Sequence, residues 1–173
     1  MPPRPVFKSF LQVGLVVNNL NEAMKRYWED LGIGPWAIYT MDSSNVKNMR
    51  IRNQKVDYAM RVGFCTLGGM QWELIEPLDD QSIYAEFLKK HGPGLHHVAV
   101  TVEDYDQTIA FLRTRGIDIL QAGTTKDGMD FAYLDTQAVM SCITEIYKIP
   151  PQWKFPPPEE IYPSLAEQKK EKE

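Results

Sequence analysis

The sequence has few cysteines, no long apolar run and no excess of basic residues, and each absence excludes a class of protein. Cys65 and Cys142 are its two cysteines, and they stand far apart without CxxC spacing. They therefore indicate neither a zinc knuckle nor a disulfide framework. No apolar run approaches the roughly 20 residues that span a bilayer. The formal net charge is -4, whereas nucleic-acid binding needs a basic face. We expect a reduced cytoplasmic protein that uses neither a membrane nor a nucleic acid as partner.

What the sequence does contain is an internal repeat. The run Leu11–Val17 has the same apolar, β-branched character as His96–Val102, which predicts a strand at the start of each half. Capping boxes at Asn19 and Asp104 follow, each leading into apolar residues at helical spacing. Three further short strands are predicted after each helix, at 36–39, 56–66 and 70–76 in the first half and at 117–121, 130–134 and 141–147 in the second.

These patterns predict an α+β fold of two tandem βαβββ modules, which form a curled, eight-stranded, partly open barrel around a metal cleft. The first module spans residues 1–77, a linker spans 78–94 and the second module spans 95–149. The linker contains a short helix at 82–90. Residues 150–173 form a Pro-rich and charged C-terminal extension. Its prolines cannot join a helix or central strand, so we expect it to run extended and to pack on the body through aromatic residues, with 167–173 as a solvated charged tail.

Four polar residues occupy matched positions of the repeat. Gln12 aligns with His97 on the first strands, and Glu73 aligns with Glu145 on the last strands. Each residue alone would more often be a solvated or hydrogen-bonded residue, but buried charges at matched positions need partners or a metal. One imidazole, two carboxylates and one amide oxygen suit one divalent ion such as zinc, nickel, cobalt, manganese or iron(II). They offer too little oxygen for a typical calcium site.

The chain resembles the vicinal oxygen chelate superfamily, which includes glyoxalases, bleomycin-resistance proteins and extradiol dioxygenases. The resemblance extends over about Phe7 to Ile149 and is nearest to methylmalonyl-CoA epimerases and glyoxalase-like proteins. The segments that carry it are Gln12–Val17, Glu73–Pro77, Gly92–Val100 and Phe131–Thr136, followed by Glu145-Ile. The Gly-Leu-His-His-Val block within the third segment is the most specific of them.

The resemblance implies metal ligands at Gln12, Glu73, His97 and Glu145. It also implies a mobile catalytic base at Glu145, with Glu73 as ligand or second base, and a homodimeric assembly. A glutamine on the first strand is what glyoxalase I has, whereas epimerases and extradiol dioxygenases have histidine there. Gln12 therefore counts against ring cleavage.

The implied activity is that of a metal-dependent isomerase, epimerase or lyase. Its substrate would be a small molecule bearing a carbonyl, a carboxyl or vicinal oxygens. A divalent ion that holds two neighbouring oxygens stabilises an enediolate, and a carboxylate beside it moves the proton. Two alternatives stay open. One is a non-catalytic small-molecule binder of the bleomycin-resistance kind, and the other is an iron(II) dioxygenase, which Gln12 disfavours.

The segment Met49–Val56 departs from the epimerase pattern. The resemblance to methylmalonyl-CoA epimerases implies two catalytic bases, with a second acidic residue in this part of the chain. The segment itself contains no acidic residue. Two-base epimerisation would then depend on Asp57. The basic residues nearby are Arg50, Arg52, Lys55 and Arg61. They predict either a site for a carboxylate or phosphate or a charged, solvated strand edge.

Three aromatic residues are candidates for a substrate pocket. Tyr147 shares a strand face with Glu145, so we expect it to contact the ligand. Trp72 and Trp36 are predicted to line an apolar pocket, with ordinary core packing as the alternative. His96 faces away from His97 if the strand alternates regularly, and it is predicted to be structural.

Overall fold

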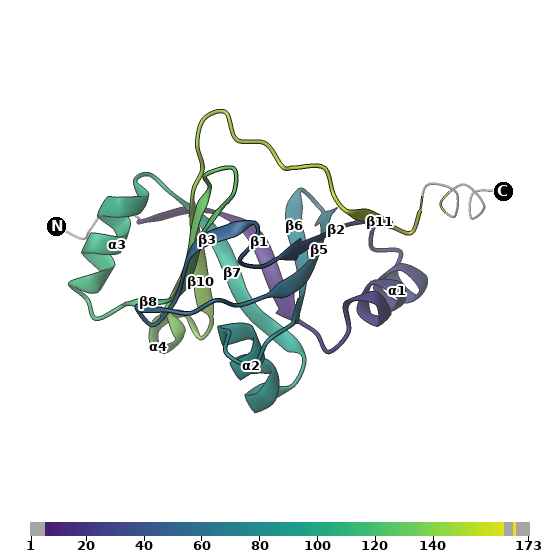
Figure 1. Ribbon diagram of the computed structural model, residues 1–173, viewed down its shortest axis with the longest axis horizontal. Coiled ribbons are helices and arrows are strands. Elements are labelled where there is room, and N and C mark those ends of the chain that lie inside the picture. Colours follow the sequence, from purple (N-terminus) through teal and green to yellow (C-terminus); the bar gives the residue numbers. More distant parts are fainter. Residues whose placement is uncertain (1–5, 165–167, 169–173) are drawn as a thin grey trace.

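The computed structural model describes residues 6–164 and residue 168 (Figure 1). All but residue 168 of the charged tail predicted at 167–173 lies outside the described residues. Among the described residues the fold is α+β, as predicted, with eleven strands in one sheet and four helices. The helices are α1 (Leu20–Leu31), α2 (Ile83–His91), α3 (Tyr105–Arg113) and α4 (Gln137–Met140). The strands are β1 (Phe7–Val16), β2 (Trp36–Met41), β3 (Val46–Ile51), β4 (Gln54–Lys55), β5 (Met60–Leu67), β6 (Met70–Pro77), β7 (Gly94–Val102), β8 (Ile119–Thr125), β9 (Asp130–Leu134), β10 (Ile143–Lys148) and β11 (Glu160–Tyr162).

The centre of the sheet is the antiparallel pair β1·β7, in which Gly14 lies opposite His97. Strand β6 pairs parallel with β1 on one side, and β10 pairs parallel with β7 on the other. Beyond β6 come β5 and β2, and beyond β10 come β9 and β8. The two halves of the sheet therefore have matching connections around the β1·β7 pair.

The prediction of a curled, eight-stranded, partly open barrel was wrong in strand count, and the sheet does not curl into a barrel. The sheet is open, with β11 and β4 as its edges, in the order β11-β2-β5-β6-β1-β7-β10-β9-β8-β3-β4. The β3–β4 hairpin was missed because charged residues interrupt its apolar alternation, although Val46, Met49 and Ile51 are buried. A turn at 42–45 carries the chain from β2 to β3, which pairs with β8 of the other half.

Local signals explain where the helices begin and end. The Asn19 side chain accepts a hydrogen bond from the Glu22 amide, and the Asp104 side chain accepts one from the Gln107 amide, so both predicted caps are confirmed. Gly32 ends α1 in the left-handed conformation, with φ of 66°. None of the helices in the described part of the chain is both long and apolar enough to cross a membrane.

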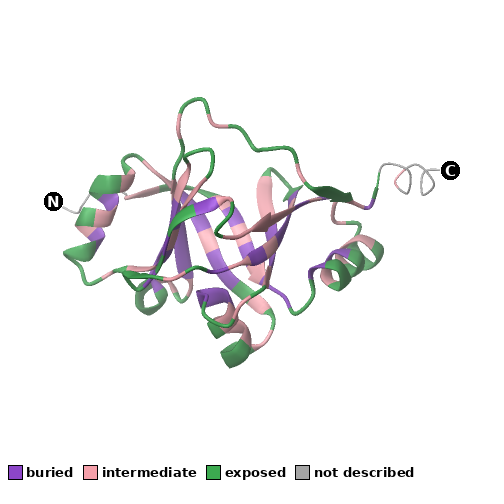
Figure 2. Ribbon diagram, in the orientation of Figure 1, coloured by how far each residue is buried: buried purple, intermediate pink, exposed green. Residues whose placement is uncertain are grey.

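The two faces of the sheet are covered differently. On one face, α1 covers the first half through a cluster that includes Leu20 and Trp36, and α3 covers the second half through one that includes Leu112. The opposite face, called the inner face below, carries a larger cluster that β3, α2 and both halves share, including Tyr84 and Tyr133. Buried residues concentrate on the central strands, while the outward sides of the helices are exposed (Figure 2).

Candidate metal centre

The four matched polar residues meet at the centre of the sheet. Glu73, Gln12, His97 and Glu145 lie on β6, β1, β7 and β10, which are four adjacent strands in that order. Glu73 shares the inner face with Ile75, and Glu145 shares it with Ile143 and Tyr147, as the alternation of side chains along a strand requires. All four are at most 5% exposed. They are called the ligand cluster below.

One ring nitrogen of His97 faces three oxygens. Its Nε2 lies 3.1 Å from Gln12 Oε1, 3.3 Å from Glu73 Oε2 and 3.2 Å from Glu145 Oε2. Ligands about 2.1 Å from one ion lie about 3.0 Å apart at the corners of an octahedron and about 3.4 Å apart at those of a tetrahedron. The observed separations fall in that range. A single N–H group can donate to one acceptor, but here three oxygens surround the same nitrogen. The separations therefore fit four ligands of one ion better than a hydrogen-bonded histidine.

The charges of the ligand cluster also fit a divalent cation. Glu73 Oε2 is buried and forms no hydrogen bond among the described residues, although it faces the shared His97 Nε2 at 3.3 Å. A buried carboxylate without compensation is strongly unfavourable. A divalent cation beside a neutral His97 would balance both carboxylates. Nitrogen and oxygen donors in this mixture suit a borderline first-row ion, so the residues present fit the predicted metal.

Without an ion, protons bound by the ligand cluster balance the charge of its carboxylates. Burial lowers the pKa of His97, but the interactions with the Glu145 and Glu73 carboxylates outweigh it and raise that pKa to about 9. Burial raises the pKa of Glu73 above its ordinary value, and the His97 charge opposes this shift. A metal ion must therefore displace at least the His97 proton.

Two neighbours orient the amide of Gln12. Its Nε2 donates to Gln71 Oε1 at 2.6 Å, which leaves its Oε1 directed at His97. The Tyr147 hydroxyl lies 2.6 Å from Glu145 Oε2 and 3.0 Å from Gln12 Oε1 and donates its proton to one of them at a time. Sequence reasoning missed Gln71, although it stands two residues before Glu73 and so on the same face.

Gly14 provides the space for the His97 ring. A Cβ atom on Gly14 would lie 1.9 Å from Cε1 of that ring, far inside van der Waals contact. The two residues are direct partners across β1·β7. Any side chain at position 14 must therefore displace the imidazole, and this requirement was also missed from the sequence.

Comparisons with known proteins identify the family of this chain. A model of the glyoxalase/bleomycin resistance protein/dioxygenase superfamily matches residues 11–133. The chain belongs to this superfamily. The matched residues include three members of the ligand cluster and end before Glu145, so the place of Glu145 in the cluster depends on the structure.

Two curated relatives and one solved structure are similar to this superfamily member. An ethylmalonyl-CoA/methylmalonyl-CoA epimerase of Cereibacter sphaeroides is 30% identical over 97 residues, which cover 54% of this chain and 72% of that protein. Hemolysin VllY of Vibrio vulnificus is 29% identical over 94 residues, which cover 52% of this chain but only 26% of that protein. The methylmalonyl-CoA epimerase structure from Mycobacterium tuberculosis has a TM-score of 0.60 at 22% identity, over 88% of this chain and 95% of that one. The structural likeness concerns the fold alone.

His96 was predicted to face away from His97, and this was wrong. Gly14 pairs with His97 and Leu15 pairs with Leu95, so His96 is an extra residue on β7. This β-bulge allows consecutive side chains to approach one another, and the two histidine Nδ1 atoms lie 3.1 Å apart. Burial and the neighbouring imidazole lower the pKa of His96 well below its ordinary value. The neutral His96 ring can therefore accept a hydrogen bond from His97 Nδ1–H and leave His97 Nε2 free for a metal.

Trp36 and Trp72 lie on the other face of the sheet from the ligand cluster. Trp36 is fully buried against α1, where its ring meets Tyr27 edge to face at a centroid distance of 5.6 Å. Trp72 packs against the same α1 cluster. Their assignment to a substrate pocket was therefore wrong, because strand alternation directs both rings to the α1 side.

The basic residues between positions 50 and 61 lie at the surface. Arg52 is 2.6 Å from Glu86, and Arg61 is 3.7 Å from Glu76. The other two basic residues are exposed on β3 and β4. Asp57 is exposed between β4 and β5, outside the ligand cluster. These positions favour the solvated strand edge over an anion site and place Asp57 outside the ligand cluster.

We predict that Gly14→Ala weakens metal binding by roughly tenfold or more, as supporting mutations around ligands do. The added methyl group must move the His97 ring. Titration calorimetry with cobalt or zinc measures the change. Gly94→Ala on β7 is the matched control, because its added carbon would lie 3.9 Å from the nearest atoms of Phe87. Equal affinities of wild type and Gly14→Ala would contradict the prediction.

We also predict that metal affinity rises by about tenfold for each pH unit between pH 6 and pH 8, because binding displaces a proton. The pKa of His97 without metal is about 9. Its proton therefore competes below that pH, and the competition ends above it. Calorimetry in two buffers of different ionisation enthalpy measures the released protons. An affinity independent of pH over this range would show that His97 is already neutral.

Proposed function

We propose that this protein catalyses a metal-dependent proton transfer at a carbon next to a carbonyl group, as an isomerase, epimerase or lyase. The observation that carries the proposal is the convergence of the ligand cluster, with its carboxylates at 3.2 and 3.3 Å from His97 Nε2. A bound divalent ion would supply a Lewis acid that stabilises the negative charge left on a substrate oxygen when the neighbouring C–H bond breaks.

Glu145 is the carboxylate we assign as the base. A carboxylate that leaves the ion to take a proton needs another partner for its charge, and Tyr147 lies 2.6 Å from Glu145 Oε2. Burial and the nearby carboxylates raise the pKa of Tyr147 well above its ordinary value, so the phenol keeps its proton and remains a donor. Glu73 Oε2 has no hydroxyl donor of this kind among the described residues and faces the shared His97 Nε2 instead, which supports Glu73 as a ligand that stays in place.

The surroundings of the ligand cluster favour one base over two. The inner face of β3 contributes Met49, a buried apolar residue, and Asp57 is exposed. Among the described residues, the acids close enough to share an ion with His97 are Glu73 and Glu145. A single mobile base that returns its proton to a neighbouring carbon therefore fits better than an epimerase with a separate second acid. Epimerisation would require Glu73 to act as the second base.

A non-catalytic binder is the second candidate, because an apolar cavity of about 250 Å³ lies between the two halves of the sheet. Such a protein would hold an apolar ligand without using the carboxylates. Metal loading separates the two functions. A binder needs no ion, whereas proton transfer beside a carbonyl needs the charge stabilisation that the ion supplies.

The proposal predicts that metal-loaded protein exchanges the acidic C–H of its substrate with deuterium from solvent. Methylmalonyl-CoA is the first compound to test, given the epimerase relative, followed by a hemithioacetal of an α-ketoaldehyde. Glu145→Gln should reduce the exchange rate by about 100-fold or more, as expected for loss of a general base. The amide oxygen would still allow metal binding. Proton NMR in deuterium oxide measures the exchange.

Glu103→Gln is the matched control, because the Glu103 side chain is 80% exposed and contacts Lys8 rather than the ligand cluster. It should exchange at the wild-type rate. A Glu145→Gln protein that retains wild-type exchange would remove the assigned base. Absence of exchange on both compounds by the metal-loaded wild type would favour the binder.

A further inference from the structure

The C-terminal strap, residues 150–159, crosses from one half of the sheet to the other (Figure 1). It follows β10 and ends where β11, an edge strand of the sheet, pairs antiparallel with β2. Three contacts hold its end in place: the Tyr39 hydroxyl donates to Pro156 O, and the Thr40 amide and hydroxyl donate to the Glu159 carboxylate at 2.8 and 2.9 Å. The strap is therefore an ordered part of the fold.

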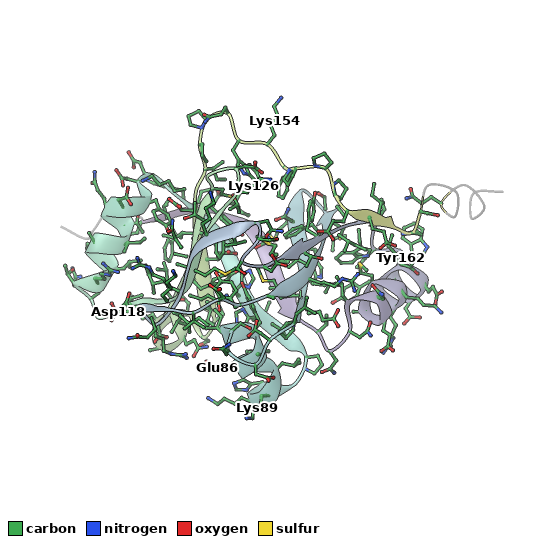
Figure 3. The ribbon with its side chains drawn as sticks, viewed as in Figure 1. Glu86, Lys89, Asp118, Lys126, Lys154 and Tyr162 are labelled. Carbon is green, nitrogen blue, oxygen red and sulfur yellow. The ribbon has the colours of Figure 1, made fainter. Side chains whose placement is uncertain are left out.

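The strap forms one wall of the cavity of about 250 Å³. Its Phe155 ring meets Phe64 at a centroid distance of 5.9 Å, Tyr39 at 6.4 Å and Trp153 at 4.8 Å. Met41 of β2 and the turn between β8 and β9 complete the lining. Figure 3 labels Lys126 on that turn below the strap, and Lys154 on the strap with its side chain directed away from the sheet. The lining is mostly carbon, which selects an apolar occupant.

Phe64, which lines the cavity, is one residue from the ligand cluster across the sheet. This residue pairs directly with Glu73 across β5·β6, so both side chains project from the inner face. Phe64 and Tyr39 also pack against the same inner-face core as Tyr147, which contacts Glu145. A group held in the cavity therefore lies on the face from which the metal ligands project.

We propose that the cavity binds an aromatic ring of the substrate, while the oxygens of the same substrate lie at the ligand cluster. This inference rests on the proposed function and adds the substrate class. A cavity of about 150 Å³ is large enough for benzene, so the present one accommodates a substituted ring. Its aromatic walls favour a ring, since edge-to-face contacts add to the effect of apolar burial. The strap thus determines which substrates fit.

Binding of fluorobenzene, followed by fluorine NMR, tests the cavity without requiring a metal. Wild type should bind the ring, and Phe155→Ala should bind it about fivefold more weakly or worse, because one aromatic wall is lost. Phe10→Ala removes a ring that is 59% exposed and lies outside the cavity, so it should bind like wild type. Met129→Trp fills the cavity from the β8–β9 turn and should abolish binding. This variant tests ring binding in the cavity independently if Phe155→Ala does not fold.

Hydroxamates test the link to the metal, because they carry two vicinal oxygens. On metal-loaded protein, benzohydroxamate or a homologue with one or two methylenes before the ring should bind about tenfold more tightly than acetohydroxamate, the gain expected from burying a ring. Phe155→Ala should remove that gain and leave acetohydroxamate binding unchanged. Equal affinities for ring-bearing and ring-free hydroxamates in wild type would overturn the proposal.

The two measurements separate the failure of this inference from the failure of the proposed function. A wild-type protein that binds no fluorobenzene has no ring site, whatever its metal content, and the inference falls alone. A protein that binds fluorobenzene but takes up no metal loses the proposed function and, with it, the substrate role of the cavity. Ring binding that Phe10→Ala weakens as much as Phe155→Ala would also overturn the proposal.

Discussion

Two carboxylates and an imidazole share one buried point at the centre of the sheet, and the rest of the structure depends on their charges being balanced there. The β1·β7 pair brings His97 against Gly14, whose missing side chain leaves room for the ring. The parallel partners β6 and β10 then bring one glutamate from each side. Because a buried carboxylate needs a compensating charge, this architecture is stable only with protons or a cation at its centre.

The two faces of the sheet therefore differ in composition, because one carries the ligand cluster and the other is apolar core. The side that α1 and α3 cover is apolar core, and it contains Trp36 and Trp72, which pack in the first half under α1. The inner face combines the ligand cluster with an aromatic core that both halves share. The strap then covers part of this face, since it links the end of β10 to β11, which pairs with β2. Under the proposed function, residues on the inner face can therefore change without disturbing the apolar core on the other face.

The ligand cluster was predictable because two regularities act together. A strand repeats every two residues, so alternation assigns each polar residue to a face, and the internal repeat gives Gln12 and His97 equivalent positions, as it does Glu73 and Glu145. Alternation also directs Trp72 away from its neighbour Glu73, so its assignment to the pocket was an avoidable error. The bulge at His96 and the β3–β4 hairpin were not predictable in this way, because each interrupts the periodic pattern. The path of the strap depends on tertiary contacts, and its prolines indicate only an extended chain.

The most direct measurement of the central claim is the metal content of purified protein, compared between His97→Ala and His91→Ala. Both variants lose an imidazole, but His91 is exposed at the end of α2. The account predicts about one divalent ion per chain in wild type and in His91→Ala, and its loss in His97→Ala. A wild-type protein that contains no ion, and that binds none of added zinc, nickel, cobalt or manganese, would contradict it.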